Sequence, residues 1–181
     1  WEFDGLPHML IAGGTGGGKT YFILTLIRAL LENNAVLHIL DPKNADLADL
    51  SSVLPNVYSR KEEIVQCITD FCTAMHERSA DMKRMENYKT GENYAYLGLS
   101  PQFLVFDEYV AFMEMLTSRE REDVLNKLRQ IVMLGRQAGF FLILACQRPD
   151  AKYLGDGIRD QFNFRVALGR MSELGYSMMF G

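Results

Sequence analysis

Residues 13–20 constrain the fold of this chain more than any other stretch, because they match the P-loop pattern G-x-x-x-x-G-K-[ST]. Glycines such as Gly13 and Gly18 tolerate backbone angles that a Cβ would forbid, and they let main-chain amides approach an anion. Those amides form an anion-binding nest that opens into the N-terminus of a helix. The motif therefore predicts binding of ATP through Gly13, Gly14, Thr15, Gly16, Gly17, Gly18, Lys19 and Thr20.

Two side chains of the P-loop have separate expected roles. Lys19 is placed to reach the β and γ phosphates, and the Thr20 hydroxyl is placed to ligate Mg²⁺. Residues 7–12 read as a short buried strand and residues 21–31 as a helix, which is the setting that the motif requires. The alternative is a glycine-rich turn that merely happens to hold a lysine. Four specified positions match by chance in about one chain in a hundred or fewer, so nucleotide binding is favoured.

A second apolar run ends in two carboxylates. Residues 102–106 read Gln-Phe-Leu-Val-Phe, and Asp107 and Glu108 follow directly. An acid at the tip of a buried strand is the Walker B arrangement, in which Asp107 holds Mg²⁺ mostly through water. Glu108 is placed to polarise an attacking water as the general base of a hydrolase. An apolar strand ending in Asp-Glu is a weak motif alone, but about ninety residues after a P-loop it predicts ATP hydrolysis.

Other polar residues follow predicted strands, at the edge where open α/β sheets place their ligands. Asp41 and Lys43 follow the run 35–40, and for Lys43 a solvated turn is at least as good an interpretation. Gln147 follows the run 140–145, and its amide is able to contact both a γ-phosphate and the attacking water. A strand-terminal glutamine with no role is the less favoured alternative. His38, within an apolar run, is better explained as a satisfied core or edge histidine than as a catalyst.

The helices between these strands carry their own start signals. Ser59 and Glu62 have the spacing of a capping box, which predicts a long helix that runs to about Tyr88. Thr117 and Glu120 form a second such pair before another amphipathic helix. Residues 163–169 read as the last strand. Because strands and helices alternate, we expect one parallel sheet covered on both faces.

The composition fits one globular domain. The chain has 181 residues, of which 48% are hydrophobic, but no apolar run approaches the roughly 20 residues that span a bilayer. The net charge of −4 neither favours nor excludes nucleic acid, since a small basic patch can lie within an acidic total. Three cysteines without metal-ligand spacing fit the reduced thiols of a cytosolic domain. We expect residues 1–181 to be a single domain excised from a longer parent chain.

The order of these motifs resembles the motor domain of the FtsK/SpoIIIE family, within the HerA–FtsK group of P-loop ATPases. The resemblance spans nearly the whole chain, and it rests on residues 7–13, 40–43, 105–108, 135–139 and 144–149. The last three stretches together are specific. P-loop proteins in general lack the series of Gly-Arg-x-x-Gly, a strand and then Gln-Arg-Pro.

This resemblance implies a RecA-like α/β fold with a mostly parallel central sheet of strand order 5-1-4-3-2 and helices on both faces. It also implies a ring, usually a homo-hexamer, around double-stranded DNA, although a monomer is compatible with the excised domain. Arg136 occupies the place of the family's arginine finger, which enters the ATP site of the neighbouring subunit. Capping of its own helix by Arg136 is the alternative, because a cation is also favourable there.

The Met-rich ending and the shortened region before Asp107 look most like the coupling ATPases of Gram-positive conjugative elements. The resemblance therefore implies an ATP-hydrolysing DNA translocase for conjugation, or for chromosome or plasmid DNA pumping. Such a motor is cytoplasmic, and it meets the inner face of the cell membrane only through segments outside this chain. Segments 43–52 and 151–160 are candidates for DNA-contacting loops because they lie near strand ends.

Three rival functions share parts of this pattern. A protein-exporting ATPase of the type VII secretion kind has the same motifs, but its turnover should be indifferent to duplex DNA. A nucleotide-binding subunit without catalysis is disfavoured by the intact Lys19, Asp107 and Glu108. A small-molecule kinase is disfavoured because a glutamate directly after the Walker B aspartate suits the activation of water rather than of an acceptor hydroxyl.

Overall fold

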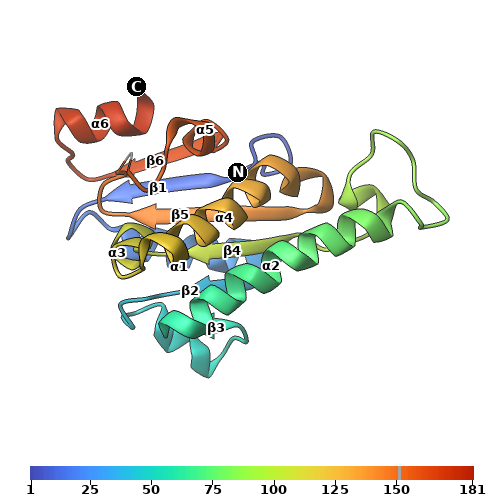
Figure 1. Ribbon diagram of the computed structural model, residues 1–181, viewed down its shortest axis with the longest axis horizontal. Coiled ribbons are helices and arrows are strands. Elements are labelled where there is room, and N and C mark those ends of the chain that lie inside the picture. Colours follow the sequence, from blue (N-terminus) through green and yellow to red (C-terminus); the bar gives the residue numbers. More distant parts are fainter. Residues whose placement is uncertain (151) are drawn as a thin grey trace.

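The computed structural model describes residues 1–150 and 152–181, and in this part of the chain six strands form one sheet (Figure 1). The sheet order is β3-β2-β4-β5-β1-β6, and every strand pairing is parallel. The strands are β1 Met9–Gly13, β2 Val36–Leu40, β3 Val57–Tyr58, β4 Gln102–Phe106, β5 Phe140–Cys146 and β6 Phe164–Leu168.

The predicted strand order is confirmed. The five strands expected from the sequence correspond to β1, β2, β4, β5 and β6, and they lie in the order 5-1-4-3-2. The added strand, β3, is a two-residue segment that pairs with the edge of β2 through Leu40 and Tyr58. Two residues carry too little periodicity to predict a strand from the sequence.

The helices lie on both faces of the sheet. In Figure 1, α2 and α4 lie in front of the sheet and α1 lies behind it. This division follows from the right-handed connection of parallel strands, because the chain moves across the sheet in one direction from β1 through β2 to β3 and in the other direction after β3. The helices are α1 Lys19–Glu32, α2 Lys61–Met82, α3 Tyr109–Glu114, α4 Ser118–Ala138, α5 Asp156–Arg159 and α6 Glu173–Phe180, with 3₁₀ turns η1 Ala48–Ser52 and η2 Tyr94–Leu97.

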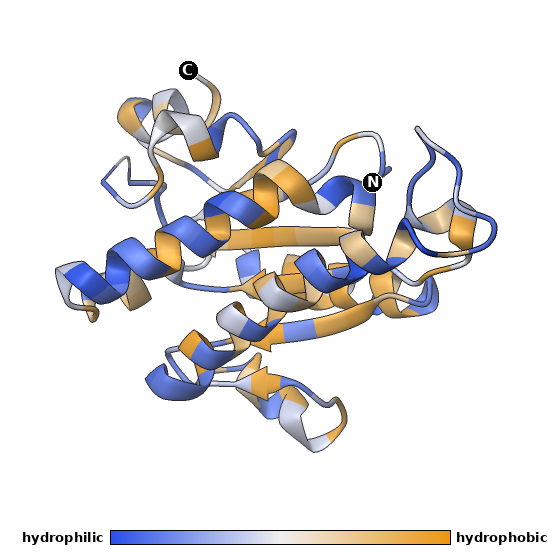
Figure 2. Ribbon diagram, turned by 45° about the vertical axis from the view of Figure 1, so that its right-hand side comes forward, coloured by the Kyte–Doolittle hydropathy of each residue, from blue (hydrophilic) through white to orange (hydrophobic). Residues whose placement is uncertain are grey.

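The core lies between the sheet and these helices. All residues of β1 and β5 are buried, which explains why their sequences are continuously apolar. Figure 2 shows the same contrast, with strands mostly orange and the outer surface of α4 mostly blue. The buried side of α4 repeats at helical spacing through Val124, Leu128 and Ile131, and this periodicity is the signal that predicted the helix.

One of the two predicted capping boxes forms and the other does not. Thr117 accepts from the amide of Glu120, and the Glu120 carboxylate accepts in return from the amide of Thr117. The prediction at Ser59 was wrong, because α2 begins at Lys61 with Arg60 as its N-cap. The chain is still extended at Arg60 after its pairing in β3, so the first helical turn starts later than the spacing suggested. The helix also ends at Met82 rather than near Tyr88.

The sheet register brings the predicted motifs to one place. Ala12 lies beside Cys146, and Phe106 lies beside both Leu40 and Leu144. The residues that follow these strands therefore share the carboxyl edge of the sheet. All three cysteines are free, which agrees with the predicted reduced thiols, and all three are buried. Among the described residues, no helix combines the length and apolar character needed to cross a membrane.

Candidate nucleotide site

A recess of about 340 Å³ lies over the P-loop, at the carboxyl edge of the sheet. We call it the P-loop recess, and it includes residues from three separate parts of the chain. Its lining consists of Gly13, Gly14, Thr15, Gly16, Gly18, Lys19, Thr20, Tyr21, Glu108 and Gln147. The sheet thus brings the P-loop, the second Walker B acid and the predicted glutamine to one cavity.

The glycines of the P-loop serve two different purposes. Gly16 and Gly18 have φ values of 79° and 84°, the left-handed region that a side chain disfavours. Gly13 does not have a positive φ, so the prediction that its backbone angles require glycine was wrong. A Cβ on Gly13 would lie 3.1 Å from the carbonyl oxygen of Leu168, so close packing against β6 explains this glycine. Gly18 caps α1, whose first residues are Lys19 and Thr20.

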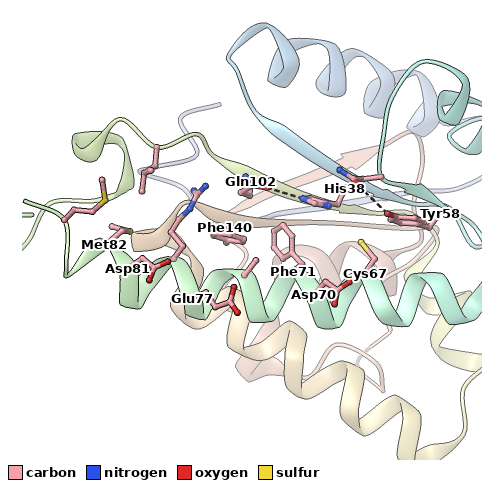
Figure 3. Close-up of a pocket in the computed structure, with 15 residues that line it drawn as sticks. His38, Tyr58, Cys67, Asp70, Phe71, Glu77, Asp81, Met82, Gln102 and Phe140 are labelled. Carbon is pink, nitrogen blue, oxygen red and sulfur yellow. Dashed lines mark hydrogen bonds between the residues drawn. The ribbon is translucent and has the colours of Figure 1, made fainter.

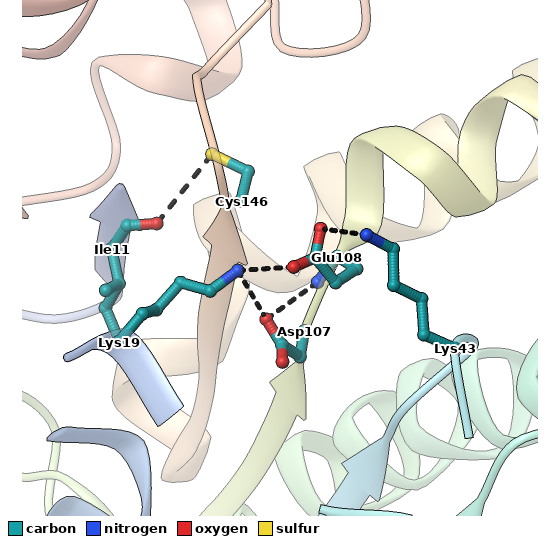
Figure 4. A network of polar contacts seen from close by, with 6 residues as sticks. All are labelled: Ile11, Lys19, Lys43, Asp107, Glu108 and Cys146. Carbon is teal, nitrogen blue, oxygen red and sulfur yellow. Dashed lines mark hydrogen bonds and ion pairs between the residues drawn. The ribbon is translucent and has the colours of Figure 1, made fainter. Parts of the chain in front are cut away.

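Lys19 joins the P-loop to both predicted acids (Figure 4). Its Nζ lies 2.6 Å from Oε1 of Glu108 and 3.2 Å from Oδ1 of Asp107. The Lys19 side chain is 9% exposed and the two carboxylates are 14% and 10% exposed, so water screens these ion pairs weakly. The three charged groups form a compact cluster at the tip of β4 and the start of α1.

Burial and charge act in opposite directions on this cluster. Burial alone would lower the pKa of Lys19, but the carboxylates of Asp107 and Glu108 outweigh it and raise the pKa. Burial raises the pKa of Asp107 despite the opposing attraction of Lys19. Burial also raises the pKa of the Cys146 thiol to about 12, which keeps that thiol neutral beside the site. A buried carboxylate is stabilised by a nearby cation, so Asp107 fits the predicted metal-ligand role.

The backbone holds Glu108 in an uncommon conformation. Its φ of 51° lies in the left-handed region, and Glu108 is the N-cap of α3. The Glu108 amide donates to Oδ1 of Asp107 at 2.9 Å. Because a non-glycine residue rarely adopts this geometry without a constraint, the conformation marks a site where the surrounding structure fixes the side chain. Here it directs the carboxylate into the P-loop recess.

Gln147 lies at the boundary between the P-loop recess and a second recess. This second recess has a volume of about 280 Å³ and is lined by Lys43, Glu108, Val110, Ala111, Glu114, Gln147, Arg148 and Asp150. Gln147 is exposed, and Glu108 also lines both cavities. The structure thus places the predicted γ-phosphate sensor beside the predicted base.

The two charged residues after β2 have different environments. Asp41 is buried, and its Oδ2 accepts from the amides of Ala45 and Ala48 at 2.8 and 3.0 Å. Its carboxylate therefore stabilises the loop that leads to η1. Lys43 instead extends to Glu108, with 3.5 Å between Nζ and Oε2. The sequence left Lys43 open between a ligand edge and a solvated turn, and the structure joins it to the site.

Arg136 lies away from the P-loop of its own chain. It belongs to the last turn of α4, which precedes β5, whereas the P-loop recess lies beyond the other end of that strand. Seven residues of β5 span about 20 Å, so the guanidinium cannot reach the recess of its own chain. Arg136 is exposed, and its Nε donates to the carbonyl oxygen of Asp4 at 2.7 Å.

Gly135 and Gly139 determine how the end of α4 packs on either side of Arg136. A Cβ on Gly135 would lie 2.1 Å from the carbonyl oxygen of Phe140, so α4 approaches the start of β5 too closely for a side chain. Gly139 ends the helix at a φ of 79° beneath the ring of Tyr94. The Gly-Arg-x-x-Gly series therefore sets the position from which Arg136 emerges at the surface.

A larger cavity, of about 500 Å³, lies between α2 and the sheet (Figure 3). It lacks the P-loop residues, and its walls include Phe71 and Phe140. His38 lies in this cavity and contacts Oε1 of Gln102 through Nε2 at 3.1 Å, while burial lowers its pKa. This partly buried, hydrogen-bonded histidine agrees with the sequence interpretation of a satisfied residue rather than a catalyst.

Two residues of the site were not assigned from the sequence. Tyr21 is 78% exposed on the rim of the P-loop recess, although the sequence placed it only in a helix. Lys43 and Glu108 are 65 residues apart in the sequence. They meet because β2 and β4 are neighbours in the sheet. A large aromatic directly after the P-loop was a visible signal for Tyr21. The Lys43 contact had no local signal.

Comparison with known proteins identifies the relatives of this chain. The model of the FtsK/SpoIIIE family matches residues 2–102. The FtsK domain-containing protein YdcQ of Bacillus subtilis is 65% identical over 182 residues, which cover 100% of this chain and 38% of YdcQ. The DNA translocase FtsK of Lactiplantibacillus plantarum is 29% identical over 187 residues, which cover 92% of this chain and 23% of that protein. The chain thus spans well under half the length of these relatives.

Solved structures show the same fold. The pCW3 conjugation coupling protein TcpA, in its monomer form with ATPγS, superposes with a TM-score of 0.83 at 21% identity. The match covers 99% of this chain and 53% of the TcpA chain. The architecture is therefore the RecA-like fold of P-loop ATPases, as the resemblance to the family implied. The family model matches more than half of the residues of this chain, so the chain belongs to the FtsK/SpoIIIE family.

Proposed function

We propose that residues 1–181 form an ATP-hydrolysing motor domain that moves double-stranded DNA, with conjugative transfer as the process it serves. One observation carries the proposal: Lys19 of the P-loop contacts both Asp107 and Glu108, and Lys19 and Glu108 line the same recess. A phosphate-binding lysine and two acids at that spacing are the minimal equipment for hydrolysis of a triphosphate. The family membership and the name of the FtsK relative support DNA as the cargo.

The residues of the P-loop recess fit ATP with Mg²⁺. The first amides of α1 and the Lys19 ammonium would bind the phosphates, and the Thr20 hydroxyl and the buried Asp107 carboxylate would hold the metal. Mg²⁺ neutralises charge on the phosphates when it is bound. Glu108 accepts a proton from water as the water oxygen bonds to the γ-phosphorus, and the bond to the β-phosphate oxygen breaks to release ADP. Gln147, which lines the recess beside Glu108, orients that water.

A ring of subunits explains the distant position of Arg136. The guanidinium is exposed at the edge of the sheet opposite to its own P-loop, so a neighbouring subunit is the site that it is able to serve. An arginine supplied by a neighbour stabilises charge on the transferred phosphoryl group. We therefore propose a homo-hexamer in the parent protein, with duplex DNA in its channel and the motor on the cytoplasmic side of the membrane.

Mixing two inactive variants tests the role of Arg136 across subunits. Arg136→Ala protein retains its own P-loop, and Lys19→Ala protein retains its arginine, so mixed rings contain some complete sites. We expect each variant alone to be nearly inactive and the mixture to recover measurable ATP turnover. Arg129→Ala, on the exposed surface of α4, is the matched control and should keep full turnover alone. Absence of any recovery in mixed rings would favour a purely structural role for Arg136.

We also propose that two segments near strand ends contact DNA. Segment 43–52 contains the loop fixed by Asp41 and the 3₁₀ turn η1, and it lies near the end of β2. Segment 151–160 begins at Ala151, which lies outside the described residues, and it includes α5. Contacts from such loops to the phosphate backbone would be independent of DNA sequence.

ATP turnover with and without duplex DNA, over a series of salt concentrations, tests the proposed function. A DNA motor should be stimulated by duplex DNA, and the stimulation should fall as salt rises because phosphate contacts release counterions. Turnover that ignores duplex DNA at every salt concentration would contradict the proposal and would favour a protein-exporting ATPase. Binding of ATP without turnover under all conditions would instead favour a nucleotide-binding subunit without catalysis.

A further inference from the structure

Lys43 is a second cation on Glu108, and neither the P-loop nor the Walker B motif accounts for it. Its Nζ lies 3.5 Å from Oε2 of Glu108, while Nζ of Lys19 lies 2.6 Å from Oε1 of the same carboxylate (Figure 4). The two lysines therefore hold different oxygens of the proposed base. We propose that Lys43 is a positioning residue, which keeps Glu108 beside the γ-phosphate when ATP engages Lys19. The inference rests on the hydrolytic function proposed above.

ATP changes the balance of charge around Glu108. Phosphates on the P-loop compete for the Lys19 ammonium, because that lysine is directed to the β and γ phosphates. Glu108 then loses its 2.6 Å partner and faces a triphosphate of the same charge. Repulsion between like charges in a poorly solvated recess is strong. Lys43 supplies the attraction that keeps the carboxylate from turning away.

The loop that carries Lys43 is fixed with respect to β4. Asp41 holds the turn by accepting from the amides of Ala45 and Ala48, and Asn44 adopts a left-handed φ of 49°. The strand before the loop, β2, pairs with β4 up to Leu40 and Phe106. The amide of Asp107 continues that pairing by donating to the carbonyl oxygen of Leu40 at 3.0 Å. Strand pairing therefore joins the backbone that leads to Lys43 to the backbone that leads to Glu108.

Lys43 acts on Glu108 rather than on the nucleotide directly. It lines the second recess, whereas Glu108 lines both the second recess and the P-loop recess. The other charged residues that line the second recess are Glu114, Arg148 and Asp150. The Lys43 side chain is 47% exposed, so its contact with the base is partly screened by water. The expected effect is therefore smaller than that of removing the base.

Lys43→Ala should separate positioning of the base from binding of ATP. We expect kcat to fall about tenfold, a fraction of what a general base contributes, while KM and the affinity for a fluorescent ATP analogue stay unchanged. Lys43→Arg should restore most of the loss because it keeps a cation at this point. Lys89→Ala, an exposed lysine on the loop after α2, is the control and should leave both parameters unchanged.

A double variant tests whether Lys43 works through Glu108. In the Glu108→Gln background there is no carboxylate to hold, so adding Lys43→Ala should cause no further loss of residual turnover. A further tenfold loss in that background would overturn the inference, as would an unchanged kcat in Lys43→Ala alone. Equal losses of kcat and of nucleotide affinity would overturn it too, because they indicate direct contact with ATP. An inactive wild-type protein would overturn the proposed function itself, together with this inference.

Discussion

Replacement of Glu108 by glutamine is expected to leave ATP bound and to lower its turnover by about a hundred- to ten-thousand-fold. The amide cannot accept the proton of the attacking water, although it fills the same place in the P-loop recess. Binding should be as tight as in the wild type or tighter. Glu108 holds Lys19 at 2.6 Å, and a neutral side chain competes less with the phosphates for that ammonium. Single-turnover hydrolysis and analogue binding, measured on the same protein, check both parts.

A matched variant separates this effect from a general loss of charge. Glu122→Gln removes a carboxylate from the exposed surface of α4 and should keep wild-type turnover. Normal turnover in Glu108→Gln would contradict the assignment of the base. Loss of ATP binding in Glu108→Gln would show that Glu108 supports the nucleotide rather than the water.

Lys19→Ala is expected to abolish turnover and to weaken ATP binding by about 10- to 150-fold, the range for hydrogen bonds to charged groups. Its loss also leaves Asp107 and Glu108 without their closest cation. The Lys19–Asp107 pair is 9% and 10% exposed, so we expect the free energy of unfolding to fall by up to about 3 kcal/mol. Urea unfolding followed by circular dichroism measures this second effect.

Two outcomes are informative for Lys19. Lys19→Met keeps much of the apolar length of the side chain, so it should weaken nucleotide binding as much as Lys19→Ala even if it recovers part of the stability. ATP affinity close to that of the wild type in either folded variant would contradict the P-loop assignment. The urea experiment guards against a variant that loses binding only because it is unfolded.

The sequence predicted the sheet and its ligand edge because those features are local. The strands β1 and β5 and residues 103–106 of β4 are continuous apolar runs, and each is followed directly by polar or glycine residues. The strand order followed from the resemblance, and the P-loop and Walker B residues then had to meet at the carboxyl edge. The same locality explains the capping box at Thr117, whose two hydrogen bonds lie within one helical turn.

The features that sequence reasoning missed depend on contacts between distant segments. Ser59 has the spacing of a capping box, but the pairing of β3 with β2 keeps the chain extended past it. The close approach of Gly13 to Leu168 depends on β6, which lies far along the chain. The contact of Lys43 with Glu108 likewise requires β2 and β4 to be neighbours. No local periodicity encodes these three contacts.

A crystal structure with Mg²⁺ and a non-hydrolysable ATP analogue would test most directly whether the P-loop and the two acids form one nucleotide site. We expect the triphosphate to lie on residues 13–20, with the metal between Thr20 and Asp107. Nζ of Lys19 should then contact the phosphates instead of Oε1 of Glu108, from which it now lies 2.6 Å. A triphosphate bound elsewhere, with the Lys19–Glu108 ion pair intact and both acids remote from it, would contradict this assignment of the site.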